Sequence, residues 1–150
     1  MSRDYDISVI NDLITTTIDS AKGFENSAEN IESGQLKQFF NEMAQERRQV
    51  VGRLQEHVRQ HGGTANDDGS LSGSLHQRWE DLRNALGGGD KAIIEEVERG
   101  EDHIKEKYEQ AMQDQELSSD CRMVVQEGYQ SVRKGHDRAR DLKHSFQGTA

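Results

Sequence analysis

Apolar side chains recur every three or four residues over most of the chain, which is the spacing that places them on one face of an α-helix. Four long stretches carry this pattern, and glycine or serine residues that favour helix ends separate them. The pattern predicts long helices over about 6–32, 34–61, 90–115 and 118–146. The chain contains no proline, so none of these helices is interrupted by that residue.

The connection between the second and third long helices is about 28 residues long. Its first part, residues 64–74, is polar and rich in glycine, as is typical of a loop. A short helix is predicted over about 74–86 from one apolar edge, formed by Leu75, Trp79, Leu82 and Leu86. Such a long connection can run the length of a bundle. We therefore predict a single all-α domain over 1–150, a ferritin-like four-helix bundle with a short extra helix in the crossover.

Charge and composition limit the kinds of partner that we expect for this chain. The net charge of -9 repels nucleic-acid phosphates and anionic lipid head groups, so neither is expected to bind. A single cysteine, Cys121, cannot form an internal disulfide, and the first residues lack the apolar stretch of a signal peptide. No stretch approaches the roughly 20 apolar residues that span a bilayer. We expect a cytoplasmic protein with no direct membrane role.

Each long helix carries one ionisable residue on or beside its apolar face, where a buried charge needs a partner, a metal ion or a function. These residues are, in chain order, Glu25, Glu46, Glu101 and His136. At about 100° per residue, Glu25 lies roughly 20° from Ile14, close to the centre of the first apolar face. One inward carboxylate or imidazole per helix is how bundle metal sites are built, and these ligands suit iron, manganese or zinc.

The pattern of a ferritin-like two-metal site is nevertheless incomplete. Such a site takes Glu from two helices and Glu-x-x-His from each of the other two. Gln49 stands where the second helix would carry His, and Arg133 stands where the fourth would carry Glu and would bring a positive charge towards the metals. Arg47, near the centre of the second apolar face, could instead pair with one of the three core glutamates. A metal site and a metal-free ionic network both stay open.

Two further polar positions lie on apolar faces. His57 and His61 are one turn apart and could bind a metal as a pair, but packing or capping near a helix end is the favoured use. Cys121 lies on the apolar face of the fourth helix, which indicates a buried and unreactive thiol. Val51 and Met123 are apolar residues left over for an interface between copies of the chain.

Several short segments carry a resemblance to a known family. They are DSAKGF at 19–24, LHQRW at 75–79, ERGED at 98–102 followed by Tyr108, and HDR at 136–138. With these segments the chain resembles the uncharacterised bacterial ferritin-like proteins, a domain family of unknown function within the ferritin superfamily. The resemblance implies a ferritin-like bundle with the short crossover helix. It also brings forward the matching positions Glu46, Glu98, Glu101 and His136, whereas Glu25 is not part of the motif.

The leading hypothesis is a small ferritin-like protein with a housekeeping or stress-related role that binds iron or a similar divalent cation in the bundle core. The candidate ligands are Glu25, Glu46, Glu98, Glu101 and His136. The alternative is a metal-free structural or protein-interaction module with a buried Glu/Arg/His network. We do not expect an enzyme, because an oxidase or peroxidase needs a metal with an open position. Self-association is expected, most simply as a dimer.

Overall fold

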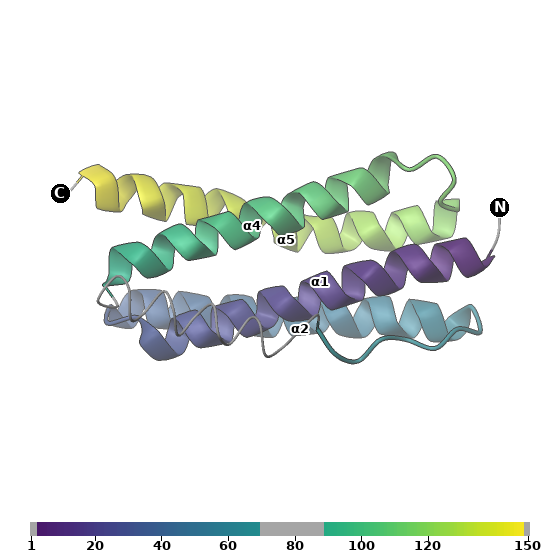
Figure 1. The fold of residues 1–150 in the computed structure, drawn as a ribbon, viewed down its shortest axis with the longest axis horizontal. Coiled ribbons are helices and arrows are strands. Elements are labelled where there is room, and N and C mark those ends of the chain that lie inside the picture. The colour runs from purple at the N-terminus through teal and green to yellow at the C-terminus, as the bar shows by residue number, and fades with distance from the viewer. Residues whose placement is uncertain (1–2, 70–88, 149–150) are drawn as a thin grey trace.

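A computed structural model describes residues 3–69 and 89–148, with side chains up to residue 145. The described residues form helices and loops and contain no strand. The helices are α1 (Arg3–Asn30), α2 (Gly34–Gln60), α4 (Asp90–Gln113) and α5 (Ser119–Gly148), as Figure 1 shows. The prediction of an all-α chain with four long helices is confirmed. The short helix predicted over 74–86 lies outside the described residues.

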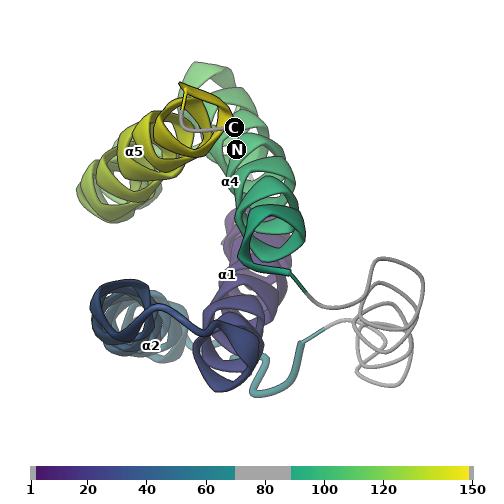
Figure 2. The same ribbon diagram turned by 90° about the vertical axis from the view of Figure 1, so that its left-hand side faces the viewer.

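The helices pack as two antiparallel hairpins. α1 lies against α2 and α4 lies against α5, while α1 also contacts α4 and α2 contacts α5. Figure 2 looks along the bundle and shows the four helices at the corners of an irregular square. Among the described helices, none combines the length and the apolar character that crossing a membrane requires.

Contacts at the two bundle ends establish the relative directions of α1, α2 and α4. At one end, the Asp90 carboxylate at the start of α4 accepts hydrogen bonds from the backbone N–H groups of Glu32 and Ser33, over 2.8 and 3.2 Å. At the other end, Gly63 follows α2 and approaches Ile7 near the start of α1. Because α2 finishes at the end opposite to the start of α4, these two helices run parallel.

The core consists of two apolar clusters, one towards each end of the bundle. The first is built around Ile10, Ile14, Ile18, Val50, Leu54, Ile104, Tyr108 and Val132. The second is built around Phe24, Ala28, Phe40, Met43, Ile94, Val97 and Ala139. On every helix the two clusters are separated by a short interval, namely 19–23, 45–49, 98–103 and 133–138. These four intervals define a middle layer of the bundle, and the polar residues described next lie in it or at its edge.

Candidate functional site

The middle layer is centred on a buried ion pair between Arg47 of α2 and Glu101 of α4. Arg47 Nη1 donates to Glu101 Oε1 over 2.9 Å, and Nη2 donates to Oε2 over 2.6 Å. The two side chains are 0% and 3% exposed. Two parallel bonds between a guanidinium and a carboxylate are the strongest geometry for such a pair. Arg47 therefore pairs with one of the predicted core glutamates, and that glutamate is Glu101.

The other N–H groups of Arg47 are also satisfied. Nη1 donates to Ser20 Oγ over 2.6 Å, Nε donates to Ser131 Oγ over 3.3 Å, and Nη2 donates to the Ser131 carbonyl over 3.2 Å. The Phe24 ring covers the guanidinium, with its centroid 5.3 Å from Cζ. All five N–H donors of the guanidinium therefore have an acceptor, which is the condition under which a charge can be buried.

Gly135 of α5 closes the ion pair on its remaining side. A Cβ atom at this position would lie 2.4 Å from Arg47 Nη2 and 2.5 Å from Glu101 Oε2. No side chain fits there, so the α5 backbone itself packs against the charged groups. The sequence pattern alone does not single out this glycine. The available signal was a glycine four residues after Ser131, in the middle of a long helical pattern.

A second glycine, Gly128, lies two turns earlier on α5 and lets the α5 backbone pack closely against the Tyr108 ring. A Cβ atom there would lie 3.0 Å from the Tyr108 ring. The Tyr108 hydroxyl lies 2.6 Å from Thr17 Oγ1, and Thr17 Oγ1 donates to the Leu13 carbonyl. Burial raises the pKa of Tyr108 to about 12, so the phenol stays neutral.

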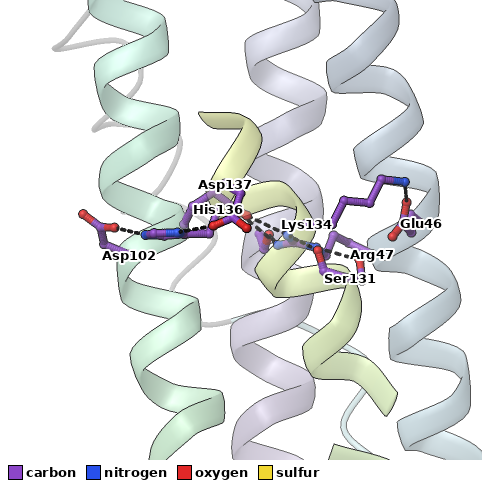
Figure 3. A network of polar contacts seen from close by, with 9 residues as sticks. Glu46, Arg47, Asp102, Ser131, Lys134, His136 and Asp137 are labelled. Carbon is purple, nitrogen blue, oxygen red and sulfur yellow. Dashed lines mark hydrogen bonds and ion pairs between the residues drawn. The ribbon is translucent and has the colours of Figure 1, made fainter. Parts of the chain in front are cut away.

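His136 follows Gly135 on α5 and lies within the middle layer. Its Nε2 is 2.6 Å from Asp102 Oδ1, and the His136 side chain is 14% exposed. Its Nδ1 is 3.5 Å from Asp137 Oδ1 and makes no hydrogen bond to any described residue. Figure 3 shows His136 and Asp102 on one side of Arg47, and Lys134 with Glu46 on the other.

The other predicted ligands each have a separate cationic partner. Glu46 accepts from Lys134 Nζ over 3.3 Å, and Glu98 accepts from Lys143 Nζ over 3.0 Å. With Glu101 bonded to Arg47 and His136 to Asp102, the structure distributes these candidates over different pairs. Within residues 3–69 and 89–148, no three His, Cys, Asp or Glu side chains come together in a way that could hold a metal ion.

Glu25 is not in the core, so its predicted inward position is wrong. Its side chain is 43% exposed and pairs with Arg48 over 3.0 Å. The angular position of Glu25 was predicted relative to Ile14, eleven residues away. A straight α-helix drifts by about 20° over each heptad relative to the buried face of a bundle, so the error grows over that distance. A long glutamate side chain near the edge of the buried face then extends into solvent.

Two further expectations are corrected. Arg133 is exposed, so the positive charge that enters the core comes from Arg47. Val51 is buried in the first apolar cluster and is not left over for a dimer interface, whereas Met123 is 60% exposed. Packing of α2 on both α1 and α5 widens its buried face beyond a single stripe, which explains the burial of Val51.

The fold and the middle layer define a class, an all-α bundle whose core contains a fully bonded ion pair. Residues 6–114 match the model of a family described as Domain of unknown function (DUF2383), and the chain belongs to this family. The resemblance to an uncharacterised domain family is thereby confirmed. The matched residues include Ser20, Arg47 and Glu101. A comparison with curated proteins finds no match.

Proposed function

We propose that this chain is a ferritin-like bundle in which a buried ion pair takes the central position of a metal site, and that it works as a metal-free structural or protein-interaction module. The observation that carries the proposal is the Arg47 guanidinium, which bonds both oxygens of Glu101.

The residues of the middle layer do not suit a metal ion. Arg47 has no lone pair to offer, and its permanent positive charge repels a divalent cation in a medium of low dielectric constant. Both oxygens of Glu101, the most buried of the predicted ligands, already accept strong hydrogen bonds. The imidazole in the middle layer, His136, is bonded to Asp102.

A structural role gives the ion pair a purpose. Replacing such a pair by apolar residues is often neutral or stabilising, so its value lies in defining one arrangement of the helices. Ser20 of α1, Arg47 of α2, Glu101 of α4 and Ser131 of α5 bond one another only when all four helices are in register. A bundle locked in this way presents its outer faces in a fixed arrangement, which suits a protein that works by docking.

We expect this docking to involve a second copy of the chain or a protein partner. The large apolar side chains exposed on the described residues are Tyr5 and Met123, so an interface would be mostly polar. A cytoplasmic location, without nucleic-acid or membrane partners, remains part of the proposal.

Elemental analysis tests the proposal. The protein, purified without a His-tag, is incubated with and without ferrous iron and desalted, and its metal content is compared with that of His136→Ala and Glu101→Gln. We expect far less than one iron, manganese or zinc atom per chain, with no dependence on either substitution. Near-stoichiometric iron that both variants lose would overturn the proposal and favour a ferritin-like metal centre.

A further inference from the structure

Residues 63–69 follow the end of α2 and run back along the α1–α2 hairpin, as the teal segment in Figure 1 shows. The first of them, Gly63, lies against Ile7 of α1, and the last, Gly69, lies against Asp19 of the same helix. The helix rises about 18 Å from Ile7 to Asp19. An extended chain covers about 20 Å from Gly63 to Gly69. The segment is therefore stretched alongside α1, and we call residues 63–69 the strap.

Side-chain amides of the two helices hold the strap by its backbone. Asn11 Nδ2 donates to the Thr64 carbonyl over 3.0 Å, and Asn11 Oδ1 accepts from the Asn66 backbone N–H over 2.8 Å. From α2, Gln55 Nε2 donates to the Asn66 carbonyl over 2.9 Å. These three bonds use backbone groups that every residue except proline carries. Asn11 and Gln55 therefore recognise an extended backbone as such.

Three positions of the strap determine which sequences fit. Gly63 fits only as glycine, because a Cβ atom there would lie 2.7 Å from Ile7 Cδ1. Ala65 packs against the first apolar cluster. The Asn66 amide donates to the α1 backbone over 3.2 Å and to Thr15 Oγ1 over 3.1 Å. The hairpin therefore selects a glycine, a small apolar residue two positions later, and an asparagine directly after it.

The strap is held weakly compared with the helices. Its five hydrogen bonds to α1 and α2 are exposed to water, which competes for the same groups. Segments with exposed hydrogen bonds and little buried apolar surface open without global unfolding. The connection also has enough length, since α2, with 27 residues, is about 40 Å long, and residues 61–89 reach about 95 Å when extended. The strap can therefore leave the hairpin while the helices stay folded.

We propose that this face of the α1–α2 hairpin binds an extended segment of a partner protein, and that the strap occupies the site as an autoinhibitory contact. The partner segment carries glycine, any residue, a small apolar residue and asparagine, in that order. Backbone hydrogen bonds supply the affinity and the small side chains supply the specificity. The inference rests on the proposed docking role and names the chemistry of the partner.

The strap of a second copy of the chain fits the site poorly. Only two residues separate Gly63 from the end of α2 at Gln60. A strap bound to another copy would therefore bring its own α2 end to the place where the α2 end of that copy already lies. A partner segment without a helix directly before it avoids this clash.

The test uses a synthetic peptide of residues 61–69, HGGTANDDG, as the probe and the full chain labelled with ¹⁵N as the receptor. The peptide is added to millimolar concentration, because a short polar segment binds weakly. The side-chain amide signals of Asn11 and Gln55 report the site directly, since both groups bond the strap. A peptide of the same composition in scrambled order is the control for the sequence pattern.

Asn66→Pro releases the strap without changing the site. Proline has no backbone N–H, and the substitution also removes both side-chain bonds, so three of the five hydrogen bonds are lost. A strap closed in about nine chains of ten weakens the apparent affinity about tenfold, so we expect the peptide to bind this variant about tenfold more tightly than the parent. Thr64→Ala is the matched control, because it keeps the carbonyl that Asn11 uses, and it should bind like the parent. Adding Asn11→Ala to Asn66→Pro should abolish binding.

The proposal is overturned if the Asn11 signals of Asn66→Pro show that the strap stays closed, if the peptide binds this variant no better than the parent, or if the scrambled peptide binds equally well. A dimer of Asn66→Pro in analytical ultracentrifugation, without peptide binding, would assign the site to a second copy and also overturn it. The metal content of the same samples tests the proposed function separately. Stoichiometric iron would refute the metal-free role and leave the peptide result standing, whereas a lack of peptide binding would refute this inference alone.

Discussion

Arg47 and Arg48 are neighbours on α2, and each forms a bond with a glutamate on another helix. The Arg47–Glu101 side chains are 0% and 3% exposed, whereas both side chains of the Arg48–Glu25 pair are 43% exposed. The two pairs contain the same chemical groups at similar distances. A turn of about 100° along the helix separates a charge in the core from a charge in solvent.

Burial decides what each pair contributes. Charges in solvent lose little when separated, and exposed pairs contribute about 0–1 kcal/mol to stability. A buried charge that loses its partner keeps its full desolvation penalty, which costs about 3–5 kcal/mol. The comparison therefore predicts very different responses to the same substitution.

The largest effect is expected from Glu101→Gln. The substitution leaves the Arg47 charge buried beside a neutral amide, so the free energy of unfolding should fall by about 3–5 kcal/mol. The matched change Glu25→Gln on the exposed pair should alter it by less than about 0.5 kcal/mol. Urea denaturation monitored by circular dichroism measures both. Equal losses of unfolding free energy in the two variants would contradict the expected difference between the buried and the exposed ion pair.

A double substitution tests whether the loss in Glu101→Gln comes from an unpaired charge. Arg47→Met combined with Glu101→Leu removes both charges and fills the layer with apolar groups. We expect the double variant to recover most of the stability, because buried ion pairs can be replaced by apolar residues at little cost. A double variant as unstable as Glu101→Gln would mean that the bonds to Ser20 and Ser131 carry the stability instead.

The next effect concerns the glycine that closes the layer. Gly135→Ala places a methyl group 2.4 Å from Arg47 Nη2, so the ion pair must shift, and we expect a loss of about 1–3 kcal/mol. Gly100→Ala on α4 is the matched control, because a Cβ atom there meets nothing within 4 Å. Without a clash, the control should gain about 0.5–1 kcal/mol from helix propensity. A gain in the free energy of unfolding for both variants in the same assay would show that the Arg47–Glu101 pair can move aside at little cost.

A smaller effect should appear on acidification, at His57. Its pKa is lowered from 6.5 by burial and by His61, so the unfolded chain takes up the proton more readily. The stability that comes from the neutral ring is fully present above pH 6.5 and is lost as the pH falls from 6.5 through the lower folded-state pKa. The stability of the parent relative to His57→Gln should therefore stay constant above pH 6.5 and decrease as the pH falls below 6.5. His103→Gln, on the exposed face of α4, should retain the parent profile.

The smallest effect is expected at the exposed pair itself. Arg48→Ala should change the free energy of unfolding by less than about 0.5 kcal/mol, and raising the salt concentration should reduce even that difference. The same salt series should leave the deficit of Glu101→Gln almost unchanged, because buried charges are screened little. A strong salt dependence in Glu101→Gln would indicate that water reaches the middle layer.

Much of the site could be predicted from the sequence. Helical periodicity placed Glu101 and Arg47 near buried faces, and both are in the core. It misplaced Glu25, since the count was extended over eleven residues while the bundle seam drifts relative to a straight helix. It did not find Gly135, because the need for a glycine arises from atoms on α2 and α4 that approach it only in the folded chain.

The sequence by itself determined the four long helices, since the three-and-four spacing of apolar residues and the helix-end residues act locally along the chain. It also determined that charged groups would meet near the core. Only the tertiary structure decided which charges these are and which partner each one has. The reason is that pairing depends on the register of one helix against another, and a shift of one residue turns a side chain by about 100°, from the core to the solvent.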